Sequence, residues 1–295
     1  MYHCKDCFYK RPLCKDCIKH EHVNHPFHRI RKWEGTHFSA CSLEALEMEL
    51  YLGHGGTRCP NLSARGGYKA RRFTLVHTNG IHQMAVHFCQ CLNHLDEPYQ
   101  LLRAQLFPPT LERPKTVFTF EFLDDFHVHS LTSKKSMYDY LDAVQRKTDA
   151  VFPDDVADRY KEAHRADRVW RYLALVRRSG QAHGIDDHLT HRRPNSLAVR
   201  CPACPEPGFN LDQTVLDLAK PSDMHKYTYF ICMDGNYRLQ QSFKTSQNSD
   251  PNDVALNNGN AYFVNDAIYK KYLKLVGLDD SVEFFNTPGS EPLYN

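Results

Sequence analysis

Cysteine and histidine are concentrated at the start of this chain, and this distribution constrains the fold more than any other feature. Residues 1–94 contain eight of the eleven cysteines and eleven of the eighteen histidines, whereas residues 95–200 contain no cysteine. The first residues lack the apolar segment of a secretion signal. Closely spaced cysteine and histidine side chains in such a chain are expected to bind metal rather than to form disulfides. The first third of the chain is therefore predicted to bind zinc.

Two Cys-x2-Cys pairs followed by two histidines form the strongest zinc pattern. A Cys-x2-Cys turn points both sulfurs to one side at the spacing that tetrahedral Zn²⁺ favours. Residues 1–33 carry eight Lys or Arg and three Asp or Glu, and they are too few to build an apolar core. Folding of this segment is therefore expected to depend on structural Zn²⁺. The candidate ligands are Cys4, Cys7, Cys14, Cys17, His22 and His28.

The spacing leaves two assignments of these ligands open. In an interleaved cross-brace module, the first cysteine pair shares an ion with the two histidines, and the second pair needs partners upstream of residue 1. In the other assignment, one ion takes all four cysteines and the histidines support them. We favour the first, because the histidines flank Pro26 and Phe27 at a spacing suited to a ligand-bearing loop. His20 and His25 are then surface residues.

A second candidate cluster lies between residues 54 and 91. If Cys89 and Cys91 are on a strand, both side chains point to one face. His54 lies five residues before Cys59 and offers a further nitrogen. The alternative is that these are free, buried cysteines, which are common. The candidate ligands are Cys59, His77, His82, Cys89 and Cys91.

Composition and periodicity predict an α+β protein in four stretches. A small zinc module is followed by a cysteine-cluster region, a helical region, and a stretch that changes to the β period. The stretches are 1–33, 34–110, 111–195 and 196–295. Helices are predicted over 42–52, 136–148, 153–178 and 261–276, and strands over 227–233 and 237–243.

The clearest basic surface is predicted on the helix that ends near residue 178. Residues 159–178 contain seven basic and two acidic side chains, although the whole chain has a formal charge of only +2. This helix either contacts DNA or is simply an exposed, solvated helix. No apolar run reaches the roughly 18 residues of a membrane helix, so we expect a soluble, intracellular protein with no membrane partner. The candidate DNA contacts are Arg165, Arg168, Arg171 and Arg178.

Two motifs in the last stretch have both a functional and a structural interpretation. Asp234 ends an apolar strand and precedes Gly235, where a metal-dependent phosphoryl-transfer enzyme could hold a carboxylate. Aspartate before glycine is also ordinary turn chemistry. Cys201 and Cys204 either form a ligand pair or, with three prolines nearby, a rigid turn.

The order of these motifs resembles the Kyakuja-Dileera-Zisupton (KDZ) transposases, particularly the fungal proteins with a KDZ-associated cysteine cluster of the Cys-x-Cys type. The matching segments extend over nearly the whole chain. They are Cys14 to Cys17, His22, residues 26–30, Trp33, residues 52–54, 77–82 and 88–91, Pro114 with Lys115, and residues 201–210 and 234–239.

The resemblance implies a transposon-derived nuclear protein whose last stretch opens a ribonuclease H-like transposase domain. Asp234 matches the first acidic residue of that domain, whose catalytic carboxylates hold paired Mg²⁺ or Mn²⁺ ions. The sequence begins at the second zinc-ligand pair and ends at Asn295 before further catalytic acids of the family appear. We therefore expect a catalytically incomplete protein that contacts DNA or other protein chains. The alternative is a zinc-stabilised protein-interaction module that does not bind DNA.

Overall fold

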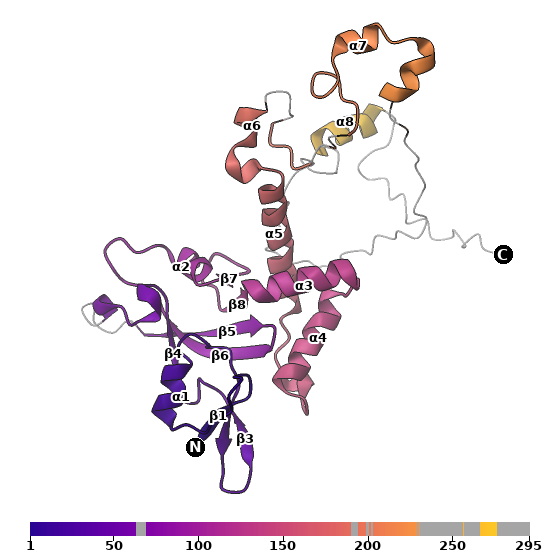
Figure 1. The fold of residues 1–295 in the computed structure, drawn as a ribbon. Helices are drawn as coiled ribbons and strands as arrows, with labels where there is room; N and C mark the ends of the chain where they lie inside the picture. Colours follow the sequence, from indigo (N-terminus) through magenta and orange to yellow (C-terminus); the bar gives the residue numbers. More distant parts are fainter. Residues whose placement is uncertain are drawn as a thin grey trace, which may run out of the picture. The chain divides into compact units, whose positions relative to one another are not determined.

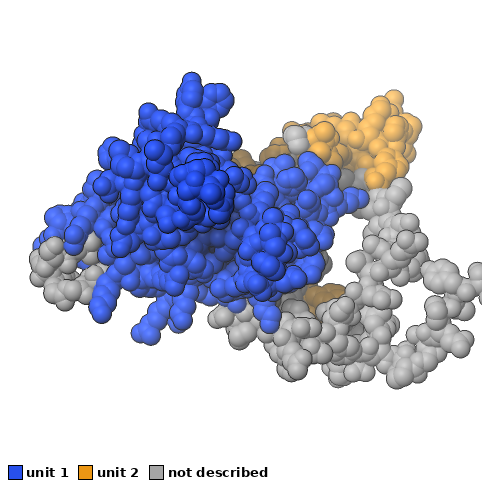
Figure 2. All heavy atoms as spheres, turned by 90° about the horizontal axis from the view of Figure 1, so that it is seen from below, with its two compact units in different colours: residues 1–171 blue, residues 172–295 orange. Residues whose placement is uncertain are grey.

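The structure, a computed structural model, divides into two compact units, residues 1–171 and 172–295 (Figures 1 and 2). The first unit contains two β-sheets and most of the long helices, and the second contains short helices and turns. The mixed α+β class is thus confirmed. The residues described are 1–62, 69–189, 194–198, 201, 203–228, 230, 256 and 266–275.

The N-terminal residues form a three-stranded antiparallel sheet with the order β1-β2-β3. A short helix, α1, connects the first two strands, and the Cys14 side chain caps it by accepting the N–H of Cys17. Cys4 and Ile30 pair across β1 and β2 and are both buried. The elements are β1 (Tyr2–Cys4), α1 (Lys15–Glu21), β2 (Ile30–Trp33) and β3 (Phe38–Cys41).

A five-stranded mixed sheet with the order β4-β6-β5-β8-β7 forms the centre of the first unit. Its two long strands, β5 and β6, are an antiparallel hairpin that turns between His77 and Gly80. β4 and β8 pair in parallel with β6 and β5, respectively. The strands are β4 (Glu49–Tyr51), β5 (Arg71–His77), β6 (Gly80–His87), β7 (Leu106–Phe107) and β8 (Thr116–Thr119).

Successive side chains along these strands point to opposite faces of the sheet, and both faces carry buried apolar side chains. Phe73 and Leu75 join one apolar cluster, which includes Ile30 of the N-terminal sheet. Val76 and Phe118 face the other cluster, formed with the helices that follow β8. The helices between residues 97 and 178 are α2 (Glu97–Arg103), α3 (Phe120–Thr132), α4 (Met137–Thr148) and α5 (Tyr160–Arg178).

The helix predicted over 42–52 is wrong. The Ser42 hydroxyl accepts the N–H of Ala45 at 3.0 Å, as a helix cap would. The chain then leaves the helical path at Glu47, where φ is 60°, and residues 49–51 form β4. Pairing with β6 satisfies this segment's backbone groups, so tertiary context overrides the local preference.

The helices predicted in the middle of the chain are largely found. α4 begins after Ser136, whose hydroxyl accepts the N–H of Asp139. The helix predicted over 153–178 is divided into a single 3₁₀ turn and α5, which ends at Arg178 before Gly180 in the left-handed region. Strand β8 lies within the stretch for which the sequence predicts helices. The 3₁₀ turns of the first unit are His54–Gly56, Pro60–Leu62 and Pro153–Asp155.

In the second unit, the strand predicted to start at residue 227 does not begin there. Tyr227 is the last residue of a 3₁₀ helix. The rest of that strand and the strand predicted over 237–243 lie outside the described residues, apart from Thr228 and Phe230, so the ribonuclease H-like assignment stays a prediction. The helices are α6 (Ile185–His188), α7 (Gln213–Asp217), α8 (Asp266–Leu275) and the 3₁₀ segments Gln181–His183 and Pro221–Tyr227. Among the helices described, none combines the length and apolar character needed to span a bilayer.

Candidate metal centres

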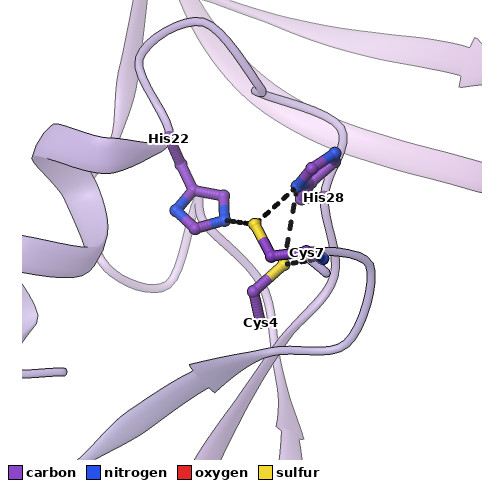
Figure 3. A group of neighbouring side chains, drawn as sticks. All are labelled: Cys4, Cys7, His22 and His28. Atoms are coloured by element: carbon purple, nitrogen blue, oxygen red, sulfur yellow. Dashed lines mark hydrogen bonds between the residues drawn. The ribbon is translucent and has the colours of Figure 1, made fainter. Parts of the chain in front are cut away.

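Cys4, Cys7, His22 and His28 converge to form what we call the N-terminal cluster (Figure 3). Cys4 ends β1, Cys7 follows in the next turn, His22 caps the C-terminus of α1, and His28 precedes β2. One donor atom from each lies within 4.8 Å of every other. Residues from three separate elements therefore present two sulfurs and two nitrogens to a single point.

The distances within the N-terminal cluster match the edges of a zinc tetrahedron. Zn–S bonds of about 2.3 Å and Zn–N bonds of about 2.0 Å, at tetrahedral angles, give about 3.5 Å between sulfur and nitrogen. The Cys4 Sγ to His28 Nδ1 distance is 3.5 Å. The Cys7 Sγ atom lies 3.5 Å from His22 Nε2 and 3.4 Å from His28 Nδ1. The four residues can therefore hold a metal ion with little rearrangement.

Backbone groups orient two of these ligands. The His22 Nδ1 atom lies 2.8 Å from the carbonyl oxygen of Ile18, which can only accept, so Nδ1 carries the proton and Nε2 is free to ligate. The Cys4 sulfur accepts the N–H groups of Asp6 and Cys7 at 3.3 and 3.2 Å. Such outer contacts fix the direction of each ligand before an ion arrives.

Burial shifts the pKa values of two residues of the N-terminal cluster. Desolvation raises the pKa of the Cys4 thiol to about 11, although the N–H groups of Cys7 and Asp6 act in the opposite direction. The pKa of His28 is lowered by burial and then by the neighbouring His25 and His22. Near neutral pH an entering cation must therefore displace the Cys4 proton, whereas His28 is already in its neutral, ligating form.

His54, Cys59, Cys89 and Cys91 form a second group, here called the CxC cluster. Cys59 Sγ lies 3.8 Å from Cys91 Sγ, which matches the sulfur–sulfur edge of about 3.8 Å expected around tetrahedral zinc. His54 Nε2 lies 3.3 Å from Cys89 Sγ and 3.4 Å from Cys91 Sγ. The group offers three sulfurs and one nitrogen, a donor set typical of structural zinc.

The backbone around the CxC cluster is adapted to bring these residues together. Gly53 has a φ of 85°, and a Cβ atom there would lie 3.1 Å from the Cβ of Cys89. Burial raises the pKa of Cys59, but the N–H groups of Gln90 and Asn61 and the side chains of Cys91 and His54 outweigh it and lower the pKa to about 6. The Cys59 sulfur is thus a thiolate at neutral pH, the form that binds metal.

The second Cys-x2-Cys pair lies apart from both clusters. Cys14 and Cys17 are exposed at the start of α1. The Cys17 N–H lies 3.4 Å from the Cys14 sulfur, and within the described residues no metal-binding group includes either cysteine. The structure therefore does not gather the first four cysteines around one point, as the second assignment from spacing requires.

His77 and His82 do not lie in the CxC cluster, contrary to their assignment from spacing. They flank the turn of the β5–β6 hairpin, whereas Cys89 follows the other end of β6. His82 and the end of β6 at His87 are five residues apart, which at about 3.3 Å per residue is about 16 Å, and Cys89 lies two residues beyond that end. Their place is taken by His54, which the sequence identifies only as a possible further ligand. The spacing of the ligands along the sequence did not identify His54 in place of His77 and His82, because it does not show which end of the hairpin each residue occupies.

The two histidines instead join the hairpin turn to the N-terminal residues. The His77 ring stacks on Phe27, with centroids 4.8 Å apart, and its Nδ1 lies 3.0 Å from Thr119 Oγ1. His82 Nε2 lies 2.9 Å from Asn79 Oδ1. Asn79 in turn donates to the carbonyl oxygen of Phe27 at 2.7 Å. Burial lowers the pKa of His82 to about 4, so its ring is neutral.

The remaining candidate residues lie in the helical part of the chain and beyond it. Arg171 pairs with Asp167 at 2.9 Å, and its guanidinium lies over the Phe126 ring. Arg165, Arg168 and Arg178 lie on the same helix, α5.

Cys201 and Cys204 are joined by a turn in the second unit. The Cys204 N–H lies 3.4 Å from the Cys201 carbonyl oxygen, and Asn210 donates to the Cys204 carbonyl oxygen. No third metal ligand accompanies this pair among the residues described. Asp234 lies outside the described residues.

Comparison with known protein families identifies one match. Residues 43–151 match the family described as CxC2-like cysteine cluster associated with KDZ transposases, and the predicted resemblance is thereby confirmed. The matched range contains the whole CxC cluster and the five-stranded sheet, whereas the N-terminal cluster precedes it. Neither a curated protein nor a solved structure matches the chain.

Proposed function

We propose, taking a KDZ transposase-associated cysteine cluster as the premise, that this chain is a DNA-binding protein in which two structural zinc ions hold the N-terminal half together. The observation that carries the proposal is the convergence of four donor atoms at each of two points. One point is offered two cysteines and two histidines, and the other three cysteines and one histidine.

The donor sets support zinc in a structural role. Thiolate and imidazole in tetrahedral array select zinc over hard cations, which prefer oxygen ligands. Each cluster supplies four protein ligands, so no position is left open for water or substrate, and this arrangement is typical of structural rather than catalytic sites. When bound, each ion supplies cross-links between separate segments of the chain. At the N-terminal cluster these segments are the ends of β1 and α1 and the start of β2.

Local positive charge supports DNA as the partner. Residues 1–33 carry eight basic and three acidic side chains, and residues 159–178 carry seven and two. Much of the affinity of a protein for DNA comes from such cations, which displace counterions from the phosphates. The association of this cysteine cluster with transposases, whose substrates are DNA, points the same way.

The DNA-binding proposal is tested by measuring the affinity of the zinc-loaded chain for a DNA duplex at several salt concentrations. We expect a steep loss of affinity with added salt. Arg165→Glu/Arg168→Glu should weaken binding to all DNA sequences. The slope of log affinity against log salt concentration should become less steep by roughly one for each phosphate that the variant no longer binds. The matched control is Lys134→Glu/Lys135→Glu, which makes the same change in net charge in the turn before α4.

Three results are distinguishable in that experiment. A selective effect of the α5 variant supports DNA contact by that helix. Equal weakening by both variants would show that only net charge matters and would remove α5 from the proposal. Absent or salt-independent binding would favour a protein-interaction module instead.

A further inference from the structure

The N-terminal sheet has one buried face and one exposed face. The register pairs His3 with Arg31, and Trp33 with Phe38. Because side chains alternate along strands, these four share a face with Ala40, opposite the buried Cys4 and Ile30. The exposed side is called the aromatic face and consists of His3, Arg31, Trp33, Phe38 and Ala40.

Three rings form a continuous group on the aromatic face. The rings of His3 and Phe38 meet edge to face with centroids 4.2 Å apart, and those of Trp33 and Phe38 are 4.9 Å apart. Trp33 is 39 % exposed and Phe38 is 36 % exposed. Large apolar side chains on a small sheet normally turn toward a core, and a contiguous exposed group points to an interaction surface.

Positive charge borders these rings. Arg31 is the cross-strand partner of His3 in the β1–β2 pair and belongs to the same face. It forms no ion pair with any residue that the structure describes. Glu34, the acidic residue of the β2–β3 turn, is held by Lys32 at 3.0 Å and by the Ser39 hydroxyl at 3.3 Å. Lys32 and Ser39 belong to the opposite set of side chains.

We infer that the aromatic face is a stacking platform for single-stranded DNA. Unpaired bases stack on exposed rings whatever their sequence, while cations beside the rings bind the backbone phosphates. Trp33 and Phe38 supply the rings, and Arg31 supplies a cation beside them. In a duplex the base faces are covered by their neighbours, so exposed rings recognise the unpaired strand. The inference rests on the proposed DNA-binding function and names the form of DNA that this face binds.

The zinc cluster and the platform are connected through the same strands. Cys4 follows His3 directly in β1, and His28 lies two residues before β2. An ion at the N-terminal cluster would therefore fix the two strands that carry His3, Arg31 and Trp33.

The test measures binding of the zinc-loaded full chain to a labelled 12-nucleotide oligo(dT). Trp33→Ala and Phe38→Ala should each weaken binding roughly 5- to 100-fold, the range seen when a stacking ring is removed. Trp33→Phe keeps a ring and should retain most of the affinity. Tyr99→Ala, which removes an exposed ring from α2, is the matched control and should bind like the unchanged protein.

A second readout does not depend on deleting a ring. The chain has two tryptophans, so in a Trp170→Phe background the tryptophan fluorescence comes from Trp33 alone. Oligo(dT) should quench it, and heparin, a polyanion without bases, should not. Zinc content identifies any variant that has failed to fold.

The outcomes separate this inference from the DNA-binding proposal. Trp33-dependent binding of oligo(dT) without binding to the duplex would retain the platform and refute the role of α5. Binding to oligo(dT) that is unchanged by Trp33→Ala, or no oligo(dT) binding, would overturn the platform even if the duplex is bound.

Discussion

The N-terminal sheet and the five-stranded sheet lie next to each other in the chain but are stabilised differently. The first has few fully buried apolar side chains of its own, chiefly Ile18 and Ile30. The second has apolar side chains on both faces and is covered by α3 and α4. Each region carries one four-residue metal cluster. Loss of metal is therefore expected to destabilise the two regions to different extents, depending on how many buried apolar side chains each region has.

This difference predicts which of the two proposed zinc ions would be essential for folding. Residues 1–41 contribute few side chains, chiefly Ile18 and Ile30, to the shared apolar core. There the ion would supply stability that so small a segment cannot obtain from burial alone. In the CxC cluster the ion would fix the loops before β5 and after β6 to a sheet that is already stable. The comparison makes the following predictions, in order of decreasing effect.

Cys7→Ser should have the largest effect. It removes a ligand of the N-terminal cluster, and structural zinc contributes on the order of 10 kcal/mol in small modules. We expect amides of residues 1–33 to lose protection from hydrogen exchange while β5, β6 and α4 keep theirs. Cys41→Ser, in the same sheet but outside the cluster, is the control. Unchanged protection in residues 1–33 would refute the metal dependence of this module.

Cys91→Ser should destabilise the protein less, by about 3 kcal/mol, the upper end of the usual range for single substitutions. The 3₁₀ turns at residues 54–62 and the loop after β6 should lose hydrogen-exchange protection, because they are joined through the CxC cluster. Strands β5 and β6 should remain folded. Collapse of the whole first unit would show that the two regions do not differ as described.

Acid should weaken the contact between the two regions through His82. Its folded pKa of about 4 is below the ordinary 6.5, so the unfolded chain takes up the proton first as the pH falls. The contribution of neutral His82 to the free energy of unfolding is fully present above pH 6.5. It is lost as the pH falls toward 4, and the total loss is about 3 kcal/mol. The free energy of unfolding, measured with urea at several pH values, should fall less steeply with acidification in His82→Gln than in the unchanged protein. Equal slopes in both proteins would contradict this, since zinc release affects both alike.

Ser136→Ala should have the smallest effect, about 1 kcal/mol, through loss of the N-terminal cap of α4. The Ser136 hydroxyl accepts the N–H of Asp139 at 3.1 Å. Thermal unfolding of the helix-covered sheet should shift by a few degrees, while zinc content stays the same. Any loss of zinc from this variant would show that metal binding depends on the helices more than we infer.

The sequence predicted the local features of this fold better than the long-range ones. α4 is recognisable because Ser136 and the spacing of its apolar residues agree, and both act within a few residues. The pair Cys4 and Cys7 is recognisable for the same reason. Strand β4 was predicted as helix because its partner residues in β6 lie 36 positions further along the chain, as Glu49 and Ala85 do.

The CxC cluster shows the same limit within a site. Its cysteines are identified by spacing, but the choice between His54 and the pair His77 and His82 depends on which end of the β5–β6 hairpin each occupies. A β-hairpin brings distant residues together and separates near ones by the length of its strands. The spacing of candidate ligands along the sequence does not give their distance in space unless the strands between them are known.

Native mass spectrometry of the full chain tests the central claim most directly. The account predicts two zinc ions per chain, one lost in Cys7→Ser and the other in Cys91→Ser, with both lost in the double variant. A chain that folds with no bound zinc, or that keeps both ions in either single variant, would contradict it.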